Sequence, residues 1–225
     1  VLILADLGPS MRFGTRVRFK SVLAAEIAAQ LAWVGLDGGD RVGGFIATAG
    51  GVKTQPMSRS SSSLLQFLKA LAESSAQEVP EGESEDVPLD VTLDRLRHVS
   101  RPGTLVFIIS DFAGFDEKAE RALRRLSLHA HVTNILVYDQ LDTMLPAGRQ
   151  RISDGLEAVA LGALSKKQLD DYAKGFADRR ERIERLCQTR GMAFHAMATS
   201  DDPRAVLQPH QRRARRPATS TRMAA

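Results

Sequence analysis

The sequence predicts an α/β protein with a doubly wound, mostly parallel sheet and helices on both faces. Short apolar runs alternate along the chain with longer segments whose apolar residues recur at helical spacing. Several of these runs are nearly continuous, which is typical of strands buried on both faces of a parallel sheet. With 225 residues, of which 43% are hydrophobic and 26% charged, the chain can bury one sizeable core.

The first third of the chain predicts three strands and a long helix. Residues 1–7 (VLILADL) form a strand that Gly8 ends. Residues 19–36 carry apolar residues at helical spacing and stop at a glycine pair. Residues 41–49 indicate a second strand. After a second glycine pair, residues 52–57 indicate a short antiparallel strand at the edge of the sheet.

The middle of the chain predicts two helices and the strongest strand. The serines at 60–63 can cap a helix whose leucines over 64–71 lie on one side. Residues 78–86 are acidic and interrupted by proline and glycine, so we expect a solvated segment there. Leucines over 89–99 mark another helix, and residues 104–109 (TLVFII) form a buried strand.

The last part of the chain continues the alternation. Residues 116–128 predict an amphipathic helix and residues 132–138 (VTNILVY) a buried strand. Residues 151–161 indicate a hairpin. Ser165 begins a long charged helix that reaches residue 190, and residues 193–198 form the last strand.

The basic excess lies in the C-terminal tail. The formal net charge is +4, and the last 25 residues hold six arginines against two aspartates, so the other 200 residues are neutral. We therefore expect one domain over residues 1–205 and a basic, disordered tail over residues 206–225. We expect no specific nucleic-acid partner, although the tail could bind phosphates or the acidic segment through charge alone.

Apolar run lengths and the cysteine count indicate the cellular compartment that we expect for the protein. There is no apolar run of membrane-spanning length and no signal peptide. Cys187 is the single cysteine, which excludes an intrachain disulfide and fits a reducing compartment. We therefore expect a cytoplasmic protein. The chain begins without Met inside an apolar run, so we expect it to extend upstream, where a membrane anchor stays open as an alternative.

Acidic residues follow three of the predicted parallel strands. Asp6, Asp111 and Asp139 each stand at the carboxyl end of a strand, the edge at which such sheets bind ligands. Ser10 offers a hydroxyl in the turn after Asp6. Oxygen groups of this kind suit Mg²⁺ or Mn²⁺. The alternative is structural, because such acids also cap helices or bond to backbone amides in loops.

The sequence lacks the residues that nucleotide binding, nucleophilic catalysis and phosphoryl transfer need. The sequence has neither a phosphate-binding P-loop nor a dinucleotide fingerprint. Ser10 lacks the flanking glycines of a nucleophile elbow, and no histidine is placed by the sequence to activate it. Phosphoryl-transfer enzymes with an aspartate at the end of the first strand have a second acid two residues later, where this chain has Gly8.

Several short motifs follow one another along residues 1–205. They are Asp6-x-Gly8-x-Ser10-Met11, Phe13-Gly14-Thr15, Ile109-Ser110-Asp111-Phe112, Tyr138-Asp139-x-x-Asp142-x-x-Leu145-Pro146 and Ser153-Asp154-Gly155. Each motif is weak alone, but in this order they together resemble the domain of unknown function 58 (DUF 58) family. The resemblance implies a core similar to a von Willebrand factor type A domain.

The resemblance also implies a degenerate metal site. In von Willebrand type A domains, three loops supply the oxygens of a metal-ion-dependent adhesion site. Asp6 and Ser10 match the first loop and Asp111 the third, whereas Gly8 and Val87 stand where two further oxygens belong. The matching residues predict a weakened or vestigial site for Mg²⁺ or Mn²⁺, or a site that holds no ion.

Two functions from different classes remain open. The first is a non-enzymatic protein-interaction module, for which the resemblance implies an AAA+ ATPase of the MoxR type as partner. The alternative is a divalent-metal-dependent hydrolase or phosphoryl-transfer enzyme that uses Asp6 and Asp111. We expect the first, because the sequence shows no general base or nucleophile beside these acids.

Overall fold

The computed structural model describes residues 1–76, 87–146, 151–153, 158–160 and 165–208. The acidic segment and the basic tail that the sequence predicts lie largely or wholly outside these ranges, as does the turn of the predicted hairpin. No helix in the described ranges is long and apolar enough to span a bilayer.

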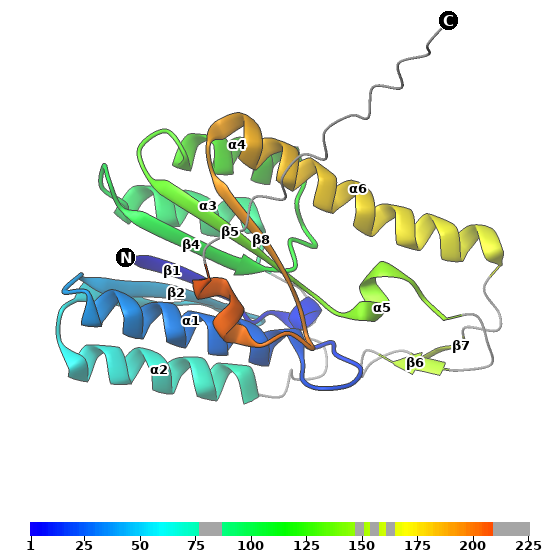
Figure 1. Ribbon diagram of the computed structural model, residues 1–225, viewed down its shortest axis with the longest axis horizontal. Coiled ribbons are helices and arrows are strands. Elements are labelled where there is room, and N and C mark those ends of the chain that lie inside the picture. Colours follow the sequence, from blue (N-terminus) through cyan, green and yellow to red (C-terminus); the bar gives the residue numbers. More distant parts are fainter. Residues whose placement is uncertain (77–86, 147–150, 154–157, 161–164, 209–225) are drawn as a thin grey trace, which may run out of the picture.

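A six-stranded sheet forms the centre of the molecule, with the strand order β3-β2-β1-β4-β5-β8 (Figure 1). Every neighbouring pair is parallel except β2 and β3, so the antiparallel edge strand expected from the sequence is confirmed. The strands are β1 (Leu2–Asp6), β2 (Val42–Thr48), β3 (Gly51–Ser58), β4 (Leu105–Ser110), β5 (His131–Tyr138) and β8 (Ala193–Ala198). A separate two-stranded hairpin consists of β6 (Arg151–Ser153) and β7 (Ala158–Ala160).

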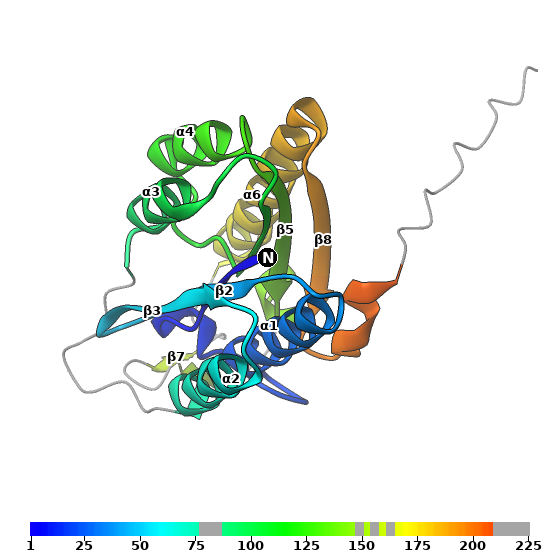
Figure 2. The ribbon, with the colours of Figure 1, turned by 90° about the vertical axis from the view of Figure 1, so that its left-hand side faces the viewer.

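Helices cover both faces of the sheet, as Figures 1 and 2 show, so the predicted doubly wound α/β class is confirmed. One face carries α1 (Lys20–Asp37) and α2 (Ser61–Ala76), and the other carries α3 (Leu89–Val99), α4 (Glu117–Leu126) and α6 (Lys166–Arg190). The described ranges also contain the short elements η1 (Pro9–Met11), α5 (Gln140–Thr143) and η3 (Pro203–Leu207).

The first strand shows why the chain needs two layers of helices. Leu2 and Leu4 of β1 belong to the hydrophobic cluster under α3, α4 and α6, whereas Ile3 and Ala5 belong to the cluster under α1 and α2. All four are fully buried, because successive side chains of a strand point to opposite faces. The side chains of a continuous apolar strand are therefore all buried only when helices cover both faces of the sheet.

Local signals account for the ends of the helices. Ser165 and Gln168 form the capping box that begins α6, and Gly191 ends this helix in the left-handed conformation at φ 67°. The Asp116 side chain caps α4 by accepting from the amides of Lys118 and Ala119. The sequence did not predict η1 or α5, because elements of three or four residues carry no periodicity.

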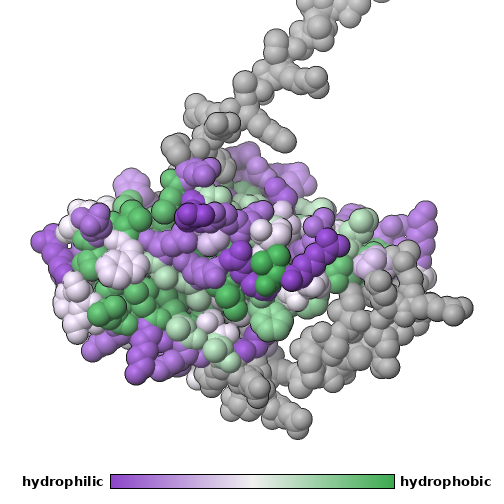
Figure 3. Space-filling view, turned by 60° about the horizontal axis from the view of Figure 1, so that its bottom comes forward, coloured by the Kyte–Doolittle hydropathy of each residue, from purple (hydrophilic) through white to green (hydrophobic). Residues whose placement is uncertain are grey.

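The face that carries α1 and α2 mixes charged and apolar side chains (Figure 3). Trp33 and Val34 near the end of α1 and Leu65 on α2 are each about half exposed. Most of a folded protein's surface is apolar, so scattered residues of this kind mark no site by themselves.

Candidate functional site at the carboxyl ends of the parallel strands

Between β1 and β4, the side on which successive strands are added to the sheet changes. From β1 the chain goes to β2 on one side, whereas β4 is followed outward by β5 and β8 on the other. In open α/β sheets this switch point is where ligands bind. Asp6 ends β1, and Asp111 directly follows Ser110, the last residue of β4, so two of the predicted site residues flank the switch point.

Asp6 is tied to the neighbouring strand. Its Oδ2 accepts a hydrogen bond of 2.6 Å from the Ser110 hydroxyl. Its Oδ1 accepts one of 3.1 Å from the amide of Gly8. The local amide bond weighed as the structural alternative is therefore present, together with a link to β4 that sequence reasoning did not anticipate.

Ser10 meets the other predicted acid. Its hydroxyl donates to Oδ1 of Asp111 at 3.3 Å, and the amide of Ala113 donates to the same oxygen at 2.9 Å. Phe112, which follows Asp111, is the one non-glycine residue of the described ranges with a positive φ, at 51°. Such a conformation costs on the order of 1–3 kcal/mol and is concentrated at functional sites.

Lys20, a residue that the sequence did not single out, completes this cluster. Its Nζ lies 2.8 Å from Oδ2 of Asp111 and 3.3 Å from Oδ2 of Asp142. Burial alone would lower the pKa of Lys20, but the two carboxylates outweigh it and hold this pKa above its ordinary value. Burial alone would raise the pKa of Asp111, yet Lys20 and the Ala113 amide hold it below its ordinary value. Both partners are therefore ionised.

Asp139 forms a second buried cluster beside the first. It is 1% exposed and accepts from the hydroxyls of Thr15 and Thr199, each at 2.7 Å, and from the amide of Leu141 at 3.0 Å. Burial alone would raise the pKa of Asp139, but these donors outweigh it and hold the pKa below its ordinary value. Asp139 also caps α5 in a capping box with Asp142, which connects the two clusters.

The loop over residues 7–19, here called the first loop, crosses this edge of the sheet. Thr15 fastens it to the end of β5 through Asp139, and Arg18 fastens it to the end of β8 by donating to the carbonyls of Thr199 and Asp201. Between these anchors, Arg16 and Val17 are exposed, Val17 to 61%. Together with the bond from Ser10 to Asp111 after β4, these anchors hold a surface loop in one shape at three strand ends.

The residues at this edge do not fit the coordination of a divalent ion in the arrangement observed. Each of the four carboxylate oxygens of Asp6 and Asp111 already accepts a hydrogen bond from the protein, one of them from an ammonium group. Gly8 offers no side-chain oxygen. Within the described ranges no three His, Cys, Asp or Glu side chains are grouped as metal ligands.

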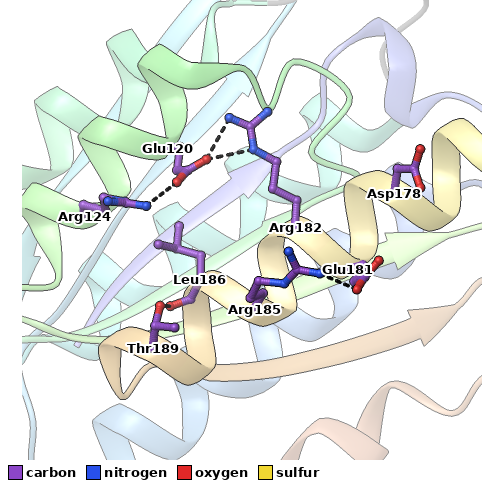
Figure 4. Close-up of a pocket in the computed structure, with 8 residues that line it drawn as sticks. All are labelled: Glu120, Arg124, Asp178, Glu181, Arg182, Arg185, Leu186 and Thr189. Atoms are coloured by element: carbon purple, nitrogen blue, oxygen red, sulfur yellow. Dashed lines mark hydrogen bonds and ion pairs between the residues drawn. The ribbon is translucent and has the colours of Figure 1, made fainter.

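A cavity of about 430 Å³ lies elsewhere, between α4 and α6 (Figure 4). Most of its charged side chains pair with one another: Glu120 accepts from Arg124 at 2.6 Å and from Arg182 at 2.8 Å, and Glu181 accepts from Arg185. The Glu120–Arg182 pair joins the two helices, whereas the other two pairs each lie within one helix.

The histidines lie away from the strand-end cluster. His129 and His131 stand before and at the start of β5, at the opposite edge of the sheet, and His98 lies in the last turn of α3. His195 lies within β8, level with Ile135. None of these four described histidines is on a loop beside Asp6 or Asp111.

Sequence reasoning missed Lys20 because a lysine among charged and small residues looks solvent-exposed. One signal could have indicated it. Lys20 is the first residue of α1, where the helix macrodipole favours acidic rather than basic side chains. A lysine at that position therefore calls for a counter-charge from elsewhere in the fold.

Solved structures of similar fold support the architecture. BatB, a conserved hypothetical protein from Bacteroides thetaiotaomicron, matches 91% of this chain and 93% of its own with a TM-score of 0.53 and 14% identity. An aerotolerance-related membrane protein from Bacteroides fragilis matches 91% of this chain and 92% of its own with a TM-score of 0.54 and 14% identity. At this identity the likeness concerns the fold.

Relatives in sequence are uncharacterised proteins of Mycobacterium bovis and Mycobacterium tuberculosis, which are 28% identical over 202 residues. That match covers 89% of this chain but only 62% of each relative. The family described as protein of unknown function DUF58 matches residues 1–182, which include the first loop, Asp6, Ser10, Lys20, Asp111 and Asp139. The resemblance predicted from the motifs is confirmed: the chain belongs to the DUF58 family.

Proposed function

We propose that this chain is a non-enzymatic protein-interaction module whose docking surface is the first loop together with the strand ends beneath it. The observation that carries the proposal is the fastening of the first loop to the ends of β4, β5 and β8 through Ser10, Thr15 and Arg18. Binding residues held on a rigid scaffold lose little conformational entropy when a partner docks. Arg16 and Val17 would be the residues presented.

The chemistry of the acids favours an interaction module over a hydrolase. A general base works best with a pKa near the operating pH. Asp111 is 4% exposed and paired with Lys20, and its pKa is held low, so it is a poor base. The described histidines, which could otherwise supply a base, lie on other elements.

For the partner we propose an AAA+ ATPase of the MoxR type, which the family resemblance implies. The site beneath the loop would be a degenerate form of a metal-ion-dependent adhesion site, with Asp6, Ser10 and Asp111 in the matching positions and Gly8 and Val87 in place of two ligands. The docking surface would then occupy the same edge of the sheet as in a complete adhesion site.

The experiment is capture of a purified MoxR-type ATPase from the same genome by the immobilised protein. Arg16→Glu reverses an exposed charge on the first loop and leaves the buried clusters intact. We expect it to weaken capture by about tenfold or more, as reversal of a charge central to an interface does. The matched control is Arg101→Glu, at an arginine that is also exposed and lies just before β4, at the opposite edge of the sheet.

Equal capture by wild type, Arg16→Glu and Val17→Asp would contradict the assignment of the surface. Failure of the wild type to capture the ATPase would contradict the proposed partner. Turnover of a phosphate ester that requires Mg²⁺ and disappears in Asp6→Asn would favour the hydrolase instead.

A further inference from the structure

The strand-end cluster combines buried carboxylates with a single buried cation. Lys20 is 4% exposed and Asp111 is 4% exposed, and they make a hydrogen-bonded ion pair across 91 positions of sequence. Taking an unpaired carboxylate out of water is costly, so Asp111 needs a positive charge within contact distance. Asp142 contacts the same ammonium, so two acids share one cation.

We propose that the Lys20 ammonium replaces the divalent ion of an adhesion site, so that the cluster is a metal-independent site held by a covalently attached cation. The proposal rests on the function proposed above, in which the first loop and the strand ends form a docking surface. It states which charge holds that surface in shape. The replacement explains why the chain can have Gly8 and Val87 where an adhesion site has two ligand oxygens. An ammonium group with three donors needs fewer oxygen partners than an octahedral ion.

The position of Lys20 in the fold supports this reading. As the first residue of α1 it stands at the end of a helix where a positive charge is unfavourable, and α1 has no acidic residue in its first turn. It packs beside Phe13, with Nζ 5.8 Å from the ring centroid. The side chain thus gains its stability from Asp111, Asp142 and the Phe13 ring of the first loop rather than from its own helix.

A fixed cation leaves no coordination position for a partner's carboxylate. In a metal site the ion keeps an open position that an outside acid can fill, whereas Lys20 is 4% exposed and two of its three donors are directed at Asp111 and Asp142. Partner binding at this surface should therefore be insensitive to chelators. The loop residues above the cluster, rather than a bridging ion, would make the contact.

The first test is titration of the wild-type protein with MgCl₂ and MnCl₂, followed by calorimetry and by the melting temperature in the presence and absence of EDTA. We expect no binding heat in the millimolar range and no difference between EDTA and divalent salt at equal ionic strength. Stoichiometric binding of either ion that is lost in Asp6→Asn would overturn the proposal.

The second test is a double-mutant cycle with Lys20→Met and Asp111→Asn. Each single variant leaves a buried partner uncompensated, and we expect its melting temperature to fall by about 10 °C. The double variant should lose clearly less than the two falls combined. Lys69→Met, at an exposed lysine of α2, is the matched control and should leave the melting temperature unchanged.

Additive losses in the cycle would overturn the proposal, because they would mean that the two charges do not depend on each other. If neither single variant folds, recovery of a folded double variant supports the pairing, and an unfolded double variant counts against it. All these measurements use the isolated protein, so they fail or succeed independently of ATPase capture.

Discussion

The hydroxyl of Ser110 joins the ends of two strands that are 104 positions apart in sequence, by donating to Oδ2 of Asp6 at 2.6 Å. The same oxygen of Ser110 accepts from the amide of Phe112 at 2.9 Å. One buried hydroxyl thus satisfies an acid on β1 and the strained backbone that follows β4. It holds the two sides of the switch point together.

Replacement of Ser110 by alanine should destabilise the fold. The change leaves the buried Phe112 amide and one oxygen of Asp6 without this partner, which typically costs about 1–3 kcal/mol in the free energy of unfolding. Chemical denaturation of Ser110→Ala beside Ser62→Ala, an exposed serine of α2, measures the difference. Equal stabilities of the two variants would mean that the Ser110 hydroxyl is not needed at the switch point.

Gly14→Ala should distort the first loop. A Cβ at Gly14 would overlap the carbonyl oxygen of Arg18 and lie 2.8 Å from Cα of Phe19, so the backbone has to move. We expect a loss of about 1–3 kcal/mol in the free energy of unfolding and weaker capture of the ATPase. Gly114→Ala, in the loop after β4, is the control because its Cβ would meet nothing within 4 Å. Unchanged stability and capture in Gly14→Ala would show that the loop shape is unimportant.

Asp139 should make the protein less stable in acid. Hydrogen bonds from Thr199, Leu141 and Thr15 hold its folded-state pKa below the ordinary value of 3.8 despite its burial. A carboxyl with a lowered pKa contributes stability that is fully present above its unfolded-state pKa and is lost as the pH falls through its folded-state pKa.

The free energy of unfolding of wild type should therefore begin to fall below about pH 5 and continue to fall below pH 3.8, and this fall should be shallower in Asp139→Asn. Denaturant titrations at several pH values measure the slope. Asp37→Asn, at an exposed aspartate of α1, should keep the wild-type slope. Identical slopes in all three proteins would contradict the role of Asp139.

Cys187 should be inert in the folded protein. It is 1% exposed, and burial raises its pKa to about 11, so only about one thiol in a thousand is ionised at pH 8. A thiol reagent such as dithiobis(nitrobenzoate) should label it slowly in buffer and stoichiometrically in guanidinium chloride. Rapid, complete labelling of the folded protein would show that the α6–sheet contact around Cys187 and Asn134 opens readily.

Local pattern in the sequence was enough to place most of the sheet and its helices. The apolar runs at β1, β4 and β5 are recognisable because a strand buried on both faces must be apolar at nearly every position. The acids that follow these strands indicated the ligand edge, because parallel strands all end on the same side. Ser165 and Gly191 marked the ends of α6 through side-chain capping and a left-handed residue.

Only the tertiary structure decided what those acids contact. Whether Asp111 faces a metal ion, water or a lysine depends on which side chain the fold brings across 91 residues, and no local pattern carries that information. The pairing of Lys20 with Asp111 and Asp142, and of Thr15 with Asp139, arises when α1 packs onto the sheet and draws the first loop over the strand ends. Local sequence therefore determined the elements and the edge, whereas long-range packing determined the charge pairing at that edge.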